Sequence, residues 1–164
     1  MREVGLKIGS DLMARCRLTG DWGKFKRFAN NFDNDLMTSA KSLVSKEAYR
    51  IQDDIKDTIL TQNQPWKPLK PQTVTSKGHS KMLYETGTLV NSIEVTKVNA
   101  LVYKIRPEGN HPSGLSNQQI GTYHEFGTQT IPARPFIRPV YKDYTKQLPL
   151  DFKAMVKEVI AKFK

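Results

Sequence analysis

The side chains best suited to catalysis or metal binding are three histidines and a single cysteine, and their spacing assembles no reactive centre. His79, His111 and His124 have no partners at the spacing of metal ligands or of a catalytic triad. His124 and Glu125 match the first half of the zinc-protease helix motif, but no histidine follows Glu125 by three residues. Cys16 cannot form an internal disulfide and has no activating neighbour, so a passive side chain is favoured over a reactive thiol. The sequence therefore predicts no enzyme, no metal and no cofactor.

Length and composition predict one globular domain that can bury a core. The chain has 164 residues, of which 38% are hydrophobic, and its mean hydropathy is −0.55. No apolar run is long enough to cross a bilayer, and the first residues lack the apolar centre of a secretory signal. We therefore expect no membrane partner.

The charge is strongly basic, with a formal net charge of +10 and a sequence pI of about 9.7. Such a surface attracts polyanions, DNA among them, and binds them less well as salt rises. The basic residues are scattered rather than clustered, so a lysine-rich surface that only keeps the protein soluble is an equally good interpretation. Net charge alone does not indicate sequence-specific recognition of DNA.

Helical spacing is clearest in the first half of the chain. From Asn34 to Thr61 apolar residues recur every three or four positions, which predicts a long amphipathic helix capped by Asn31 or Asp33. Its apolar stripe should cover a sheet. The preceding segment also has helical spacing, and its aromatic stripe is backed by basic side chains. A core face is favoured there over a nucleic-acid surface. The aromatic stripe consists of Trp22, Phe25, Phe28 and Phe32.

Alternation of apolar and polar residues predicts a small antiparallel sheet. A strand or a short helix-to-strand passage carries Leu89, Ile93 and Val95, and Asn99-Ala100 is a predicted hairpin turn. The second strand follows that turn and ends at Pro107. The remaining predicted segments are a weak strand at 3–8, a mobile surface loop at 108–119 and a third strand at 120–126.

Proline-rich segments on either side of this sheet predict extended arms. The segment 62–81 loses all periodicity, and Trp66 and Leu69 within it either tuck into the domain or belong to a docking arm. After Gly127, three prolines stiffen a second arm on which Phe136 and Ile137 are apolar anchors. We expect this second arm to dock on a partner. The prolines are Pro132, Pro135 and Pro139, and the arm also carries Arg134 and Arg138.

The C-terminal region should end in an amphipathic helix. The segment 140–148 is either a helical turn or a strand, interrupted by Pro149, and Asp151 could cap the final helix. The predicted fold class is therefore α+β: a long amphipathic helix packed on a small antiparallel sheet, with proline-rich extended arms and a C-terminal helix.

Four motifs in a fixed order resemble tail-completion proteins of long-tailed bacteriophages, a group that includes the minor tail protein Z type and related virion-morphogenesis proteins. The motifs are Trp66-x-Pro68-Leu69 with Thr73 and Lys77; Leu83-x-x-Thr86-Gly87-x-Leu89-x-x-Ser92-Ile93; Tyr123-x-Glu125-Phe126-Gly127-Thr128; and Ala133-Arg134-Pro135-Phe136-Ile137-Arg138-Pro139. The resemblance covers residues 33–141 of the single domain 1–164, leaving 1–32 as an N-terminal extension and 142–164 as a C-terminal helical segment.

The resemblance implies a non-enzymatic virion protein of the phage neck, which completes the tail and joins it to the DNA-filled head. Copies of the chain would form a ring around the DNA channel and meet a tail terminator or tail tube protein and a head-closure or connector protein. A tail terminator is the near alternative, and a basic, non-sequence-specific DNA-binding protein is the alternative of another class. The implied location is the virion, and the host cytoplasm during assembly. The residues predicted to meet a subunit or partner are Trp66, Thr86, Gly87, Leu89, Tyr123, Glu125, Phe126, Gly127, Thr128, Arg134, Pro135, Phe136, Arg138 and Pro139.

Overall fold

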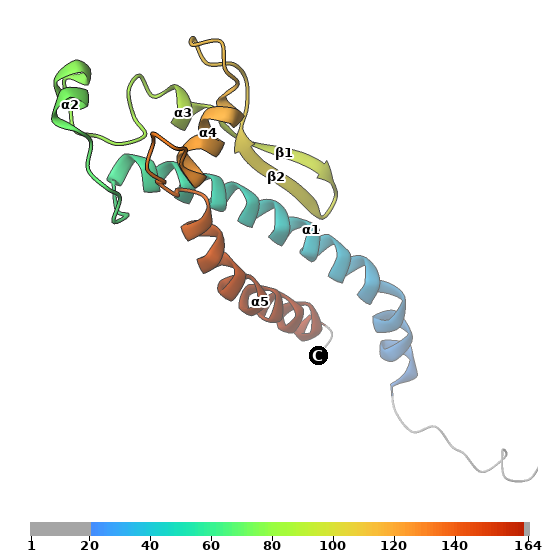
Figure 1. The fold of residues 1–164 in the computed structure, drawn as a ribbon. Coiled ribbons are helices and arrows are strands. Elements are labelled where there is room, and N and C mark those ends of the chain that lie inside the picture. Colours follow the sequence, from blue (N-terminus) through green and yellow to red (C-terminus); the bar gives the residue numbers. More distant parts are fainter. Residues whose placement is uncertain (1–20, 163–164) are drawn as a thin grey trace, which may run out of the picture.

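The computed structural model describes residues 21–162, and its fold is α+β, as the sequence predicts (Figure 1). A long helix lies between a two-stranded antiparallel hairpin and a C-terminal helix. The predicted strand at 3–8 and Cys16 lie outside the described residues. The elements are α1 (Trp22–Thr61), α2 (Pro71–Lys77), α3 (Thr88–Asn91), β1 (Ile93–Asn99), β2 (Val102–Pro107), α4 (Asn117–Phe126) and α5 (Arg138–Ala161).

Helix α1 is one helix of 40 residues, so the predicted cap at Asn31 or Asp33 is wrong. The cap is Asp21, whose Oδ1 accepts a hydrogen bond from the Lys24 backbone nitrogen at 3.0 Å. Nothing stops the helix near Asn31, because residues before and after it continue the same helical spacing. The predicted packing is confirmed in part, since α1 contacts both strands and also α5.

Strands β1 and β2 form the predicted hairpin. They pair antiparallel from Ile93 opposite Pro107 to Asn99 opposite Val102, with an irregularity between Lys97 and Asn99. The Asn99 Oδ1 accepts a hydrogen bond from the Leu101 backbone nitrogen at 2.9 Å, which closes the turn that the sequence predicts.

The predicted third strand is wrong, because residues 117–126 form helix α4 and the sheet has two strands. A capping box begins this helix: the Ser116 side chain accepts from the Gln119 backbone nitrogen, and the Gln119 side chain accepts from the Ser116 backbone nitrogen. The aromatic residues Tyr123 and Phe126 favoured a strand by propensity. The residues that the helix buries instead recur every four positions: Asn117, Gly121 and Glu125.

Two further predictions about local structure are wrong. The proline-rich segment after Trp66 contains the short helix α2, which Pro71 begins because a proline fits the first helical turn. The C-terminal region is a single helix, α5, which starts at Arg138 and continues through Pro149. Pro149 removes one backbone donor, but it does not break a helix that is held by tertiary packing against α1.

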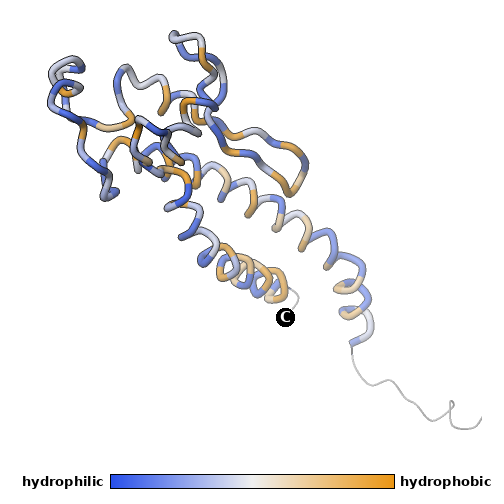
Figure 2. The backbone as a smooth tube through the Cα atoms, in the orientation of Figure 1, coloured by the Kyte–Doolittle hydropathy of each residue, from blue (hydrophilic) through white to orange (hydrophobic). Residues whose placement is uncertain are grey.

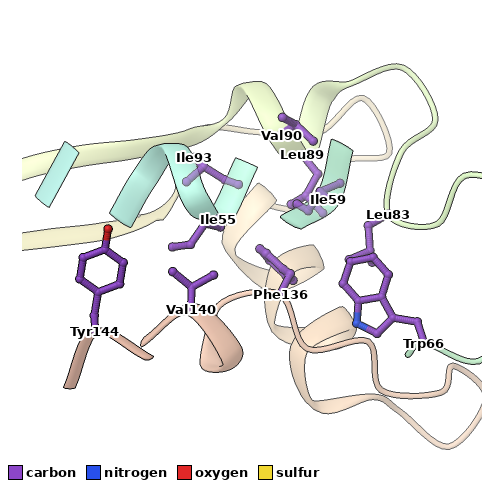
Figure 3. Close-up of a cluster of buried hydrophobic side chains, with 10 residues drawn as sticks. All are labelled: Ile55, Ile59, Trp66, Leu83, Leu89, Val90, Ile93, Phe136, Val140 and Tyr144. Atoms are coloured by element: carbon purple, nitrogen blue, oxygen red, sulfur yellow. The ribbon is translucent and has the colours of Figure 1, made fainter. Parts of the chain in front are cut away.

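The core joins segments from the whole domain (Figure 3). Ile55 and Ile59 of α1 face Phe136 and Val140, while Trp66 closes one end of the cluster. The other members come from the segments around α3 and from α5: Leu83, Leu89, Val90, Ile93 and Tyr144. Burial of these side chains stabilises the junction of α1, the hairpin and the start of α5.

The start of α1 extends past the hairpin (Figure 1) and still carries hydrophobic residues between hydrophilic ones (Figure 2). The expectation of a core face is wrong for the first two rings, because Trp22 and Phe25 are 47% and 57% exposed. The rings contact one another along the helix, with centroids 5.4 Å apart for Trp22 and Phe25 and 4.9 Å apart for Phe28 and Phe32. The described residues therefore leave the first two rings of the aromatic stripe exposed, while Phe28 and Phe32 are half-buried.

Candidate functional site

Glu125 is the residue that holds two of the predicted motifs together. Its side chain, on the last turn of α4, is buried, with the residue 4% exposed. Oε2 accepts hydrogen bonds from the backbone nitrogens of Phe136 at 2.8 Å and Ile137 at 3.0 Å, and Oε1 accepts from that of Arg138 at 3.0 Å. These are donors at the start of α5 that lack partners within the helix, so Glu125 acts as a cap supplied by another helix.

Arg138 closes the same junction from its exposed side. Its Nε donates to the Glu125 Oε1 at 3.0 Å, and its Nη2 donates to the Glu125 backbone carbonyl at 2.8 Å. The guanidinium carbon also lies 4.9 Å from the ring centroid of Phe126, a cation–π contact. The Glu125 junction (Glu125, Phe126, Phe136, Ile137 and Arg138) thus joins the Tyr-x-Glu-Phe-Gly-Thr motif to the Arg-Pro-Phe-Ile-Arg-Pro motif.

Hydrogen bonds join the proline-rich segment around Trp66 to the segment that follows Gly127. The Trp66 Nε1 donates to the Pro135 carbonyl at 2.9 Å, and Trp66 itself is buried. Arg134 donates from Nε and Nη2 to the Lys67 carbonyl at 3.2 and 3.0 Å. Of the two alternatives for Trp66, the structure favours a loop tucked into the domain. The segment after Gly127 also packs on its own chain, since Phe136 is 0% exposed.

Gly127 makes the turn between the two motifs. Its φ of +78° and ψ of 173° lie in a region that only glycine adopts readily. A Cβ there would lie 2.8 Å from the Ala133 backbone nitrogen and 3.0 Å from the Ile131 carbonyl oxygen. Thr128 stabilises the loop that follows, because its Oγ1 accepts from the Ile131 backbone nitrogen at 3.0 Å. The predicted glycine turn is therefore confirmed.

The Thr-Gly motif begins α3. Gly87 precedes that helix with a φ of +82°, and the hydroxyls of Thr86 and Thr88 lie 2.6 Å apart across it. Leu89 then points into the core beside Ile59 (Figure 3). This motif therefore sets the direction of the chain into β1 and contributes to the same core as the Glu125 junction.

A pocket of about 770 Å³ opens between α2, α4 and the loop after Gly127. Basic side chains line it, with one carboxylate, Glu85. Its walls also include apolar side chains such as Leu69 and Ile131, and several threonines. We call it the basic pocket and define it by Lys67, Lys70, Lys77, His124 and Arg134.

Burial and mutual repulsion shift the protonation of these groups. Desolvation lowers the pKa of His124, and the charges of Arg134 and Lys77 lower it further. Desolvation also lowers the pKa of Lys77, against the attraction of Glu85. The Nδ1 of His124 is buried and has no hydrogen-bond partner within the described part of the chain. The region therefore disfavours additional positive charge.

The predicted interface residues divide into two groups. The members that face the core or the inside of the junction are buried: Trp66, Gly87, Leu89, Glu125, Arg134 and Phe136. They are covered within the chain, so they support the surface rather than form it. The exposed members are Thr86, Tyr123, Phe126, Thr128 and Arg138, while Gly127, Pro135 and Pro139 are partly exposed. For the exposed and partly exposed members a partner contact stays a prediction.

Lys67, Lys70 and His124 were not predicted as site residues. Local sequence gives no signal for the pocket, because its cations lie on segments that only tertiary contacts bring together. Residues 21–162 hold no group of three or more His, Cys, Asp or Glu side chains that could bind a metal ion. In the same part of the chain, none of the helices is long and apolar enough for a bilayer crossing.

Comparison with known proteins gives one distant relative. The chain is 26% identical over 137 residues to an uncharacterized protein of Methanocaldococcus jannaschii, an alignment that covers 82% of this chain and 98% of the archaeal protein. No family model matches the chain. No solved structure matches it at a significant level.

Proposed function

We propose that this chain is a structural protein of the neck of a long-tailed bacteriophage, which completes the tail and joins it to the DNA-filled head as part of a ring around the DNA channel. The observation that carries the proposal is the Glu125 junction, because two motifs of the resemblance bind each other there. Four hydrogen bonds to one buried carboxylate explain why these motifs occur together. The resemblance thus concerns a physically connected framework rather than scattered residues.

The surface of the chain supports an assembly role. Large apolar side chains remain exposed at the start of α1, at the tip of the hairpin and along α5. Soluble monomers rarely leave many such side chains together, whereas subunits of an assembly cover them with neighbours. The exposed side chains include Trp22, Phe25, Val98, Leu101, Val102, Tyr141, Leu150 and Phe152. A net charge of +10 suits a ring through which DNA passes.

The decisive experiment is electron microscopy of particles made by a phage that lacks this gene. We expect DNA-filled heads and free tails of normal length, with joining restored when the gene is supplied in trans. Tails of irregular length would assign the tail-terminator role instead. Normally joined particles would refute a role in the neck.

A second candidate function is non-specific DNA binding, which the exposed aromatic stripe favours. Trp22 and Phe25 alternate with Lys24, Lys26 and Arg27, so stacking and phosphate contacts could act together. This function requires binding of duplex or single-stranded DNA by the isolated protein, with affinity that falls steeply with salt. Titration of labelled DNA at two salt concentrations tests it, with Trp22→Ala as the variant that should weaken the complex.

A further inference from the structure

The basic pocket carries more positive charge than its own chain balances. Lys67, Lys70, Lys77 and Arg134 line it together with one carboxylate, Glu85. Like charges gathered around a partly desolvated space repel one another: burial first, and then the charges of Arg134 and Lys77, lower the pKa of His124. An anion in the pocket would relieve that repulsion.

The environment of Arg134 is the strongest local argument for such an anion. It is 6% exposed, and among residues 21–162 no carboxylate forms a salt bridge with it. Its guanidinium has five N–H donors, and its side-chain bonds go from Nε and Nη2 to the Lys67 carbonyl. Nη1 therefore has no acceptor within the described chain. A buried guanidinium without a counter-ion is unfavourable, and a carboxylate, like a phosphate, fits its planar fork.

The pocket walls indicate what kind of molecule brings this carboxylate. Leu69, Leu83 and Ile131 lie beside the cations, so the ligand should carry apolar groups next to its charge. The phosphates of a DNA duplex form a continuous ridge, which fits poorly against Arg134, a residue only 6% exposed. The start of this chain is also unsuitable, because residues 1–20 carry Arg2, Lys7, Arg15 and Arg17 against Glu3 and Asp11.

We propose that the basic pocket binds an acidic side chain, carried between apolar residues on an extended segment of a partner protein, with its carboxylate at Arg134. This proposal rests on the proposed function, in which such a partner is a neighbouring neck or tail protein. The threonine hydroxyls of the pocket and the lysines at its rim add polar contacts around the same group. Specific docking by one inserted carboxylate would fix the orientation of the partner on the ring.

The test uses the full chain and two short capped peptides, one with alternating leucine and glutamate and one with glutamine in place of glutamate. Binding is followed by NMR through the backbone resonances of the residues that line the pocket. We expect the glutamate peptide, and not the glutamine peptide, to shift His124 and Thr128. Peptide binding should also raise the pKa of the His124 imidazole, because a bound carboxylate offsets the neighbouring cations.

Two double variants distinguish binding at the pocket from a general effect of surface charge. Lys67→Glu/Lys70→Glu changes two exposed side chains at the pocket, and Lys97→Glu/Lys104→Glu makes the same charge change on two exposed side chains of the hairpin. We expect the pocket variant to weaken the glutamate peptide by about tenfold or more, equivalent to about 1.4 kcal/mol, and the hairpin variant to weaken it much less. Arg134→Gln should abolish binding, and its amide spectrum reports whether it remains folded.

Unchanged pocket resonances with the glutamate peptide, or equal shifts with the glutamine peptide, would overturn the proposal. Stronger shifts of the same residues with inorganic phosphate or a short DNA duplex would overturn it in favour of a phosphate site. The proposal about the pocket and the proposal about the neck role can fail independently. A pocket that binds no peptide leaves the gene-deletion result intact, whereas normally joined particles refute the neck role even if the peptide binds.

Discussion

The two tryptophans occupy opposite environments in one chain. Trp66 is 7% exposed and donates a hydrogen bond to the Pro135 carbonyl, while Trp22 is 47% exposed and contacts the ring of Phe25 on the same helix. Phe136 and Phe25 differ in the same way. Both regions combine aromatic and basic residues, so composition does not distinguish them.

Long-range contacts, not helical spacing, therefore decide which aromatic residues form the core. The aromatic stripe has the spacing of a buried helix face, yet within residues 21–162 its first two rings, Trp22 and Phe25, stay exposed. Trp66 lies in a loop without periodicity, yet two distant proline-rich segments meet around it. The first region is therefore a surface available to partners, and the second is the framework.

The largest effect on stability is expected from Phe136→Ala. Its side chain is fully buried between α1 and Trp66, and removal of such a ring costs about 3–5 kcal/mol. Urea unfolding followed by circular dichroism measures the change. The matched variant Phe25→Ala should change the free energy of unfolding by about 0.5 kcal/mol or less, because that ring is exposed. Equal effects of the two variants would remove the distinction between framework and surface.

Gly127→Ala should destabilise the chain by about 2–4 kcal/mol, since it combines an unfavourable backbone conformation with a close approach to other backbone atoms. The new Cβ would lie 2.8 Å from the Ala133 nitrogen. Gly114→Ala is the control, because Gly114 also has a positive φ but no atom within 4 Å of a Cβ. We expect the control to lower the free energy of unfolding by about 1 kcal/mol. A loss at Gly127 no greater than at Gly114 would contradict the crowding argument, with thermal melts as the measurement.

Glu125→Gln should destabilise the chain by about 2–3 kcal/mol, because the neutral amide replaces an acceptor of several charge-assisted hydrogen bonds at the start of α5. The affected donors are the backbone nitrogens of Phe136, Ile137 and Arg138. Hydrogen exchange of these amides should accelerate. Glu158→Gln, at an exposed position of α5, should leave both stability and exchange unchanged. Slow exchange at 136–138 in Glu125→Gln would mean that another group caps the helix.

The smallest effect is expected from acidification at His124. Its folded-state pKa lies below the ordinary value because of burial and the nearby Arg134 and Lys77, so the unfolded chain binds this proton more readily. The contribution of neutral His124 is therefore fully present above about pH 6.5 and decreases as the pH falls below that value. An NMR titration should give a midpoint below about 6.5 for this imidazole. His124→Gln should reduce the acid-induced loss of stability, and a midpoint at or above the ordinary value would contradict the assignment.

Much of the local structure follows from short-range rules. The first half of the chain gives helical spacing, Asn99-Ala100 gives the hairpin turn, and Gly127 gives the turn after Phe126. The errors arose where propensity and pattern disagreed. Residues 120–126 have strand-forming aromatics, but the capping box at Ser116 begins a helix. Pro149 predicted a break in α5, but packing against α1 holds the helix across it.

The candidate site was predicted only as a set of motifs. Two of these motifs do lie together in the structure, since Glu125 of one accepts hydrogen bonds from Phe136, Ile137 and Arg138 of the other. Their environment was not predicted, because an acidic residue in a segment with the propensity of a strand gives no sign that its carboxylate caps the start of α5. The basic pocket was missed for the same reason.

The sequence by itself determined the α+β class, the long amphipathic helix, the hairpin and the glycine turn, because these depend on neighbours within a few residues. Only the tertiary structure decided that Trp66 and Phe136 are core and that Trp22 and Phe25 are exposed. It also decided that Arg134 lies buried in a basic pocket with no carboxylate partner among residues 21–162. Burial and electrostatic environment depend on which distant segments meet. No pattern along one segment records that information.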